Sequence, residues 1–179
     1  MARQREKLLI VDGYNVLRSG DRYRQISVPD YTDDAFNTAR ETLINDVVNY
    51  AGHDWHAIIV FDGAQNALST GETESVGGVR IMFSPAGQSA DKIIEKLAHD
   101  ARERRIEVLV VTSDATIQDT VFGFGVDRMS ANGFSHEMGM YYEDVRLDNT
   151  PKTAGKNTVS GRIDSETLAK LKALRDDAS

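Results

Sequence analysis

Three segments of this 179-residue chain share the pattern that most constrains its fold, an apolar, β-branched run that ends at an aspartate. They are residues 8–12, 58–62 and 108–114, which end at Asp12, Asp62 and Asp114. Near-continuous apolar runs of this length are typical of strands buried on both faces of a parallel sheet between helix layers. Residues 79–83 and 126–129 predict two further strands.

Helical patterns separate these strands. Apolar residues at helical spacing predict helices over residues 32–50 and, after a Ser89 N-cap, over residues 89–101. Shorter helices are expected over residues 115–122 and 135–145. The alternation of strands and helices predicts an α/β fold, a three-layer α/β/α sandwich around a central parallel sheet. The glycine-rich residues 69–78 are interpreted as a surface loop.

The chain is expected to divide near residue 150. Residues 1–150 form the α/β domain, and the polar stretch that follows has the composition of a linker. Residues 164–175 place Leu168, Leu171 and Leu174 on one helical stripe. A helix this short is unstable alone, so residues 151–179 are expected to dock on the domain or on a partner.

Composition excludes several classes of site. The absence of cysteine removes disulfides, thiolate zinc sites and thiol nucleophiles, and the four histidines form no close pair of ligands. There is no apolar run of the ~20 residues that span a bilayer. The charged N-terminus has no signal-peptide core, so we expect a cytoplasmic protein without a membrane partner.

The net charge of −7 argues at first against nucleic acid as a partner. Two features weaken that objection. Some acids are candidates for metal ligands, whose charge bound cations would offset. Basic residues are also unevenly spread, with Arg18, Arg22 and Arg24 close behind the first strand, although solvated surface charge is the simpler interpretation of any one of them.

The aspartates at the strand ends indicate where chemistry should occur. In open parallel sheets, ligands bind outside the carboxyl ends of the strands, where Asp12, Asp62 and Asp114 are expected. Clustered carboxylates raise one another's pKa unless a cation lies among them, and oxygen ligands suit Mg²⁺. Asp91, in the first turn of a helix, should face the same crevice. Glu95 lies one turn later and points the same way, but it could equally be a surface partner of Lys92 or His99.

Such a cluster suits metal-assisted displacement at phosphorus. There is no G-x-S-x-G elbow, no phosphate-binding G-x-x-x-x-G-K motif and no G-x-G-x-x-G after a strand. We therefore expect no organic small-molecule cofactor.

Four motifs in order resemble the YacP-like branch of the NYN domains, within the PIN-like nuclease fold. They are residues 9–17 (LIVDGYNVL), residues 60–63 (VFDG), residues 89–91 (SAD) followed by Ile94 and Glu95, and residues 111–114 (VTSD) with Gln118. The similarity covers nearly the whole chain, including a closing helix like that of residues 168–175.

The resemblance implies a PIN-like endonuclease that cleaves single-stranded RNA with Mg²⁺ or Mn²⁺. Asp12, Asp91 and Asp114 would be the metal-binding catalytic acids, with Asp62 completing or edging the site. Supporting roles fall to Asn15, Ser113, Gln118 and Glu95. The resemblance also implies messenger RNA as a substrate and the ribosome as a partner, although the tail is near charge neutrality, where a basic one would suit ribosomal RNA better.

We further expect Tyr14, Arg18, Arg22 and Arg24 to line the approach to the crevice and contact the RNA backbone. Two alternatives to the nuclease stay open. One is a PIN-like module that binds RNA or the ribosome without cutting. The other is a phosphatase of small phosphoesters, although the D-x-D motif of one major class is absent at Asp12.

Overall fold

The computed structural model of the chain describes residues 6–27, 33–63, 71–117 and 125–149. The chain divides into two compact units, Met1–Tyr141 and Tyr142–Ser179. The sheet, its helices and the candidate site belong to the first unit. Of the second unit the structure describes residues 142–149, which are helical and carry an ion pair between Arg146 and Glu143.

The described strands form one sheet in the order β3-β4-β2-β1-β5-β6. Their bounds are β1 Lys7–Asp12, β2 His56–Phe61, β3 Thr73–Val76, β4 Val79–Phe83, β5 Glu107–Val111 and β6 Val126–Met129. All neighbours are parallel except β3, which runs antiparallel to β4 at the edge. The five strands expected from the sequence are confirmed, and the sheet is mixed because of the sixth.

The edge strand β3 corrects the interpretation of residues 69–78 as a loop. Only Gly77 and Gly78 separate β3 from β4, and both have positive φ, 57° and 84°. A two-residue turn of this kind requires φ > 0 at both positions, which glycine adopts without a steric penalty. The Gly-Gly pair was therefore the hairpin signal, and β3 escaped notice because all four of its side chains are exposed and carry no apolar alternation.

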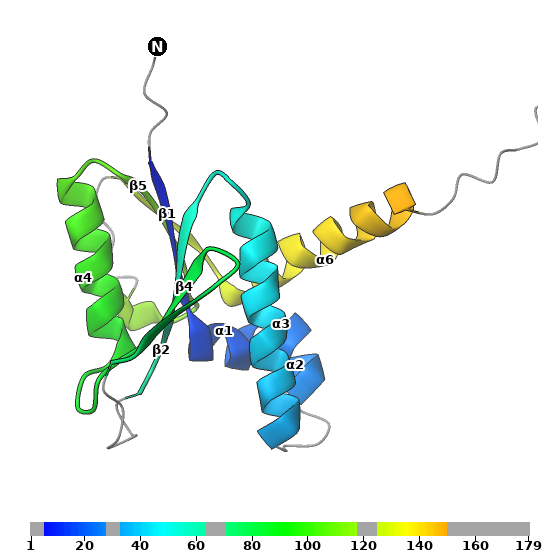
Figure 1. The fold of residues 1–179 in the computed structure, drawn as a ribbon, viewed down its shortest axis with the longest axis horizontal. Coiled ribbons are helices and arrows are strands. Elements are labelled where there is room, and N and C mark those ends of the chain that lie inside the picture. The colour runs from blue at the N-terminus through cyan, green and yellow to red at the C-terminus, as the bar shows by residue number, and fades with distance from the viewer. Residues whose placement is uncertain (1–5, 28–32, 64–70, 118–124, 150–179) are drawn as a thin grey trace, which may run out of the picture. The chain divides into compact units, whose positions relative to one another are not determined.

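Helices cover both faces of the sheet (Figure 1), as the predicted three-layer sandwich requires. Helix α4 (Ala90–Glu103) packs on one face, where Ile10, Val60 and Val110 form a buried cluster with Ile94 and Ala98 of the helix. On the other face lie α1 (Gly13–Ser19) and α3 (Asp33–Ala51), with α2 (Asp21–Ser27) packed against α3.

Helix α3 confirms the first predicted helix, since Ala39, Leu43 and Val47 are fully buried. Helices α1 and α2 were not expected, because seven-residue helices show little periodicity. They nevertheless bury Val16, Leu17 and Tyr23, so the segment after β1 is packed structure.

The remaining helix predictions fare differently. Ser89 is the N-cap of α4 as expected, although its side chain makes no capping hydrogen bond. Helix α6 spans Ala131–Asn149, longer at both ends than predicted. Residues 115–117 are helical, and the rest of the helix expected there lies outside the described residues. The linker and closing helix expected over 151–179 also lie outside them, so the domain boundary near residue 150 stays a prediction. No helix among the described residues is long and apolar enough to cross a membrane.

Candidate active site at the carboxyl ends of the strands

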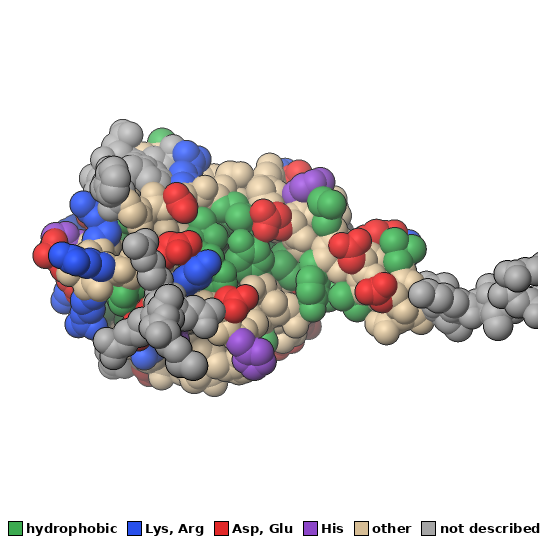
Figure 2. All heavy atoms as spheres, turned by 90° about the horizontal axis from the view of Figure 1, so that it is seen from above, with side chains coloured by type: hydrophobic (Ala, Val, Ile, Leu, Met, Phe, Trp, Pro, Cys, Tyr) green, Lys and Arg blue, Asp and Glu red, His purple; other side chains and the backbone are tan. Residues whose placement is uncertain are grey.

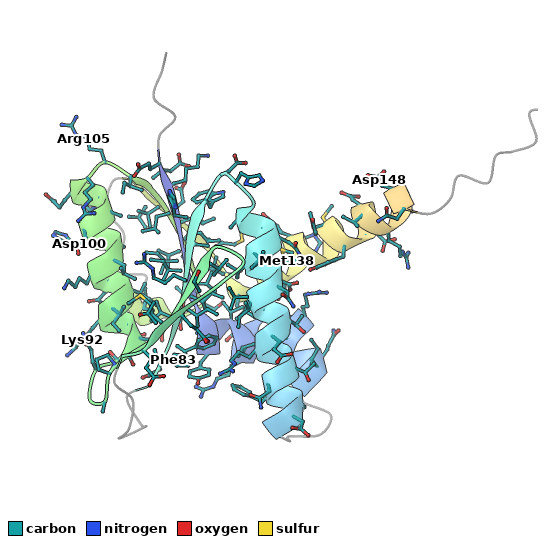
Figure 3. The ribbon with its side chains drawn as sticks, in the orientation of Figure 1. Phe83, Lys92, Asp100, Arg105, Met138 and Asp148 are labelled. Atoms are coloured by element: carbon teal, nitrogen blue, oxygen red, sulfur yellow. The ribbon has the colours of Figure 1, made fainter. Side chains whose placement is uncertain are left out.

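Strand alternation and register bring acids from distant parts of the chain to one face of the sheet. Asp12 shares the parity of Ile10, which packs under α4, and Asp62 shares the parity of Val60. Because side chains alternate between faces, both carboxylates follow the α4 side of the sheet. Asp91 lies in the first turn of α4 itself. Figure 3 shows this helix end, marked by Lys92, beside Phe83 at the carboxyl end of β4.

The acids predicted from the sequence meet in one hollow of about 560 Å³. Four aspartates contribute to it, each from a different segment of the chain. The hollow is lined by Asp12, Tyr14, Asn15, Arg18, Ser19, Asp62, Ala90, Asp91 and Asp114. The expectation that residues 12, 91 and 114 share a crevice agrees with this geometry.

Asp12 is the most enclosed of these acids, with 6% of its surface exposed. The Thr112 hydroxyl donates a 3.0 Å hydrogen bond to its Oδ2, and the backbone N–H of Asp114 donates to the same hydroxyl at 3.1 Å. Gly13 lets α1 begin directly behind this aspartate, since an added Cβ would lie 2.4 Å from the buried Phe61 ring. The carboxylate of Asp12 is therefore held in one orientation at the floor of the hollow.

A second set of hydrogen bonds ties α1 to the segment after β5. The Asn15 side-chain oxygen accepts a 2.8 Å bond from the backbone N–H of Ser113. The Ser113 hydroxyl in turn accepts a 2.9 Å bond from the backbone N–H of Ala131, at the start of α6. Asn15 and Ser113 thus brace the loop that carries Asp114.

Asp62 and Asp114 sit nearer to solvent. Asp62 is exposed and accepts a long, 3.3 Å hydrogen bond from the Ser84 hydroxyl, which itself accepts the Gly63 backbone N–H at 2.8 Å. Asp114 accepts a 2.8 Å bond from the backbone N–H of Thr116. Asp62 therefore occupies the edge of the hollow.

Burial and mutual repulsion shape the ionisation of the cluster. Burial raises the pKa of Asp12 to about 6, helped by the charges of Asp91 and Asp114 and opposed by the Thr112 hydroxyl and the Asn15 backbone amide. Burial also raises the pKa of Asp91, together with the charges of Asp114, Asp62 and Glu95. A bound cation would relieve the repulsion between these neighbouring carboxylates and favour their ionised forms.

The residues fit a hard divalent cation by their chemistry. The acidic residues that line the hollow are all aspartates, which offer oxygen ligands. Mg²⁺ commonly takes one or two carboxylates and completes its shell with water and substrate oxygen. Among the residues that the structure describes, no three His, Asp or Glu side chains are already grouped closely enough to hold an ion by themselves. A bound Mg²⁺ would therefore have to complete its shell with water or substrate oxygen in addition to these carboxylates.

The basic residues expected at the crevice separate into two groups. Arg18 and Tyr14 line the hollow, with the guanidinium 5.9 Å from the Tyr14 ring centroid. Arg22 instead binds the buried Asp46 through its Nε at 2.7 Å, and Arg24 lies 3.5 Å from Asp21. Neither Arg22 nor Arg24 lines the hollow.

Arg22 differs from Arg18 in what holds its guanidinium, and its expected contact with RNA stays a prediction. Asp46 is 1% exposed and also accepts a 2.8 Å bond from the Tyr23 hydroxyl, so a buried carboxylate holds Arg22 in place. The sequence pattern of three closely spaced arginines could not show this, because Asp46 lies on a different helix.

Two of the expected supporting residues that the structure describes, Ser113 and Glu95, do not line the hollow. Glu95 raises the pKa of Asp91 without lining the hollow, and Gln118 lies outside the described residues. Thr112 and Ser84, whose hydroxyls donate to Asp12 and Asp62, were not identified from the sequence. The sequence did offer an indication for Thr112, because it lies two residues before Asp114 and directly after the strand β5, which neighbours β1.

Fold and site define a class of protein, an α/β domain with a mostly parallel sheet and an acidic crevice outside its strand ends. Within that class the chain belongs to the YacP-like NYN domain family, whose sequence model matches residues 9–176.

Individual relatives agree with this assignment. The chain is 28% identical over 160 residues to the uncharacterized protein YacP of Bacillus subtilis (strain 168), covering 87% of this chain and 91% of that one. It is also similar to the crystal structure of Rae1 (YacP) from Bacillus subtilis, with a TM-score of 0.61, 29% identity and 95% of each chain covered. A crystal structure of a point mutant of that protein matches with the same TM-score over 79% of each chain.

Proposed function

We propose that this protein is an endoribonuclease that hydrolyses phosphodiester bonds of single-stranded RNA with Mg²⁺ or Mn²⁺. The observation that carries the proposal is the convergence of Asp12, Asp62, Asp91 and Asp114 on one hollow. A pure binder of polyanions gains nothing from such a cluster, because its field repels phosphate.

The chain's own residues have distinct tasks in this proposal. Asp12, Asp91 and Asp114 hold the cations, and Asp62 completes the site from its edge. Once bound, divalent cations lower the pKa of attacking water and stabilise charge on the phosphoryl oxygens. The Thr112 hydroxyl keeps the Asp12 carboxylate in one orientation, and the Asn15–Ser113 bond keeps Asp114 near it.

RNA recognition at the hollow rests on Tyr14 and Arg18. Arg18 is the only Lys or Arg among the described residues that line the hollow, so it is suited to contact a phosphate beside the acids. The guanidinium lies close to an aromatic ring, an arrangement that also suits a stacked base. The resemblance to YacP-like domains supports messenger RNA as the substrate and the ribosome as the partner.

The proposal is tested with a fluorescent single-stranded RNA of mixed sequence, incubated with protein and Mn²⁺ or with EDTA. Cleavage should stop with EDTA and in Asp12→Asn and Asp91→Asn, while circular dichroism shows a preserved fold. Asp127→Asn, an exposed acid on β6 outside the hollow, is the matched control and should cleave normally. Chelator-resistant cleavage, or full activity in both site variants, would rule the proposal out.

The alternative is a module that binds RNA or the ribosome without cutting. The lack of a ready three-ligand group among the described side chains is the observation that favours it. Calorimetric titration with Mn²⁺ separates the two functions. A nuclease shows a saturable site that Asp12→Asn abolishes, whereas a silent module shows none.

A further inference from the structure

A second hollow lies at the opposite end of the sheet, where the strands begin. It measures about 360 Å³ and adjoins the first residues of β1 and β2, the turn before β4 and the last turns of α4. Its floor is formed by apolar residues. They are Leu8, Ala57, Ile58, Leu97, Ala101 and Ile106.

The charged residues around this hollow are mostly basic, although the chain as a whole is acidic. The chain carries a net charge of −7, whereas Lys7, Arg80 and Arg104 line this hollow beside one acid, Asp100. Figure 2, which views the end where the strands begin, shows Lys and Arg side chains gathered on the α4 side with apolar surface beside them. This end therefore favours an anion with an apolar part.

The three cations differ in their freedom. The Lys7 ammonium lies 3.6 Å from a Glu107 carboxylate oxygen and 5.2 Å from the Trp55 ring centroid, so its position is held. The side chains of Arg80 and Arg104 form no hydrogen bond or ion pair with any residue that the structure describes. Within the described part of the chain, two guanidinium groups at one hollow thus keep their donors available.

Helix α4 places an opposing influence on the same hollow. Its C-terminal carbonyls carry the negative end of the helix dipole, which disfavours anions. Arg104, at the C-cap position, offsets this negative charge. Arg80 lies on strand β4, so the helix dipole does not explain its position. Dipole compensation therefore accounts for one of the two arginines only.

We propose that this hollow binds a small organic phosphate of nucleoside monophosphate size. The guanidinium groups of Arg80 and Arg104, unpaired among the described residues, suit the oxygens of a phosphomonoester, which guanidinium binds by two parallel hydrogen bonds. The apolar floor accepts the base or sugar. The volume lies within the range of small-molecule pockets. This site is separate from the acidic hollow and does not depend on the proposed cleavage.

The geometry favours a small ligand over an RNA backbone. A polymer needs cations spread along a track, whereas Arg80 and Arg104 line the same concavity. Outside the hollow, Glu103 interrupts the neighbouring arginines Arg102, Arg104 and Arg105.

The test uses calorimetry in buffer with EDTA, which keeps nucleotides from binding through cations at the acidic hollow. The probes are AMP, UMP, adenosine and inorganic phosphate. Fluorescence of Trp55, the single tryptophan, provides a second readout because its ring contacts Lys7 at the rim. AMP or UMP should bind more tightly than either fragment. Arg80→Gln and Arg104→Gln should each weaken binding about tenfold, as expected for the loss of a charged hydrogen bond.

Two variants serve as matched controls. Arg102→Gln removes an exposed arginine of α4 outside the hollow, and Asp12→Asn alters the other site; both should bind AMP normally. The proposal fails if neither nucleotide binds saturably, if phosphate alone binds as well as AMP, or if Asp12→Asn abolishes binding. It also fails if an RNA oligonucleotide without a terminal phosphate binds more tightly than AMP and Arg80→Gln weakens that binding. This result would assign the hollow to the polymer.

Discussion

The Thr112 hydroxyl donates a 3.0 Å hydrogen bond to the Asp12 carboxylate, although 100 positions separate the two residues along the chain. The contact exists because β1 and β5 are parallel neighbours with Val11 opposite Val111, so the residues that follow these two also lie side by side. Thr112 is fully buried, and its hydroxyl joins Asp12 to the backbone of Asp114.

Replacing Thr112 tests whether this bond positions Asp12. Thr112→Val keeps the shape and removes the hydroxyl, so kcat for RNA cleavage should fall about tenfold, the worth of one hydrogen bond to a charged group. The hydroxyl lowers the pKa of Asp12, so its loss should raise that pKa and weaken Mn²⁺ binding more at pH 6 than at pH 8. Thr112→Ser should restore both properties. Equal Mn²⁺ weakening at the two pH values would indicate a purely structural role.

The raised pKa of Asp12 predicts a pH dependence of stability in the metal-free protein. The folded state binds the Asp12 proton more tightly than the unfolded state, whose pKa is near 3.8. Stability should therefore fall as pH rises from 3.8 through about 6, and the full cost is present above that window. At 1.36 kcal/mol per pKa unit, the cost is on the order of 3 kcal/mol.

Asp12→Asn removes this cost while its amide oxygen still accepts the Thr112 hydroxyl. In EDTA at pH 8, urea denaturation should show the variant to be more stable than the wild type, with little difference at pH 4. Mg²⁺ should raise the melting temperature of the wild type at pH 8 and have little effect on the variant. A wild type that loses no stability between pH 4 and pH 8 in EDTA, relative to the variant, contradicts the prediction.

Asp62 and Asp91 should differ in their importance. Asp62 is exposed and lies at the edge of the hollow, whereas Asp91 is partly buried and its pKa is raised by burial and by three neighbouring carboxylates. Asp91→Asn should abolish RNA cleavage, and Asp62→Asn should lower kcat/KM by about tenfold, or about 1.4 kcal/mol. Single-turnover kinetics measures both. Equal losses would place Asp62 at the centre of the site.

Arg22 should matter for stability and not for RNA. Its guanidinium is bound to Asp46, which is 1% exposed, and removing one partner of a buried pair leaves a desolvated charge. Arg22→Leu should therefore destabilise the protein by about 3 kcal/mol in urea denaturation. Arg18→Gln, on the hollow, should leave stability unchanged and reduce the salt dependence of RNA binding.

A double-mutant cycle completes this test. Arg22→Leu combined with Asp46→Asn should cost less than the sum of the single changes, because each loses the same contact. Weaker RNA binding by folded Arg22→Leu protein would return Arg22 to the RNA-contacting set.

Local sequence pattern by itself determined the central strands and the acids that follow them. Apolar runs ending at Asp12, Asp62 and Asp114 indicated buried strands, and the topology of parallel strands brings their carboxyl ends to one edge. Patterns with weak periodicity did not reveal the seven-residue helices α1 and α2, whose stability comes from packing Val16 and Tyr23 rather than from their own pattern.

Only the tertiary structure decided which polar partners meet. Thr112 reaches Asp12 through strand register, and Arg22 reaches Asp46 because α2 packs on α3. A side chain's spacing along the chain reports its own face and turn, whereas its partner is set by the contact between two elements. Hydrogen bonds and ion pairs across such contacts therefore became known only from the tertiary structure. They distinguish Arg18, at the hollow, from Arg22, which holds two helices together.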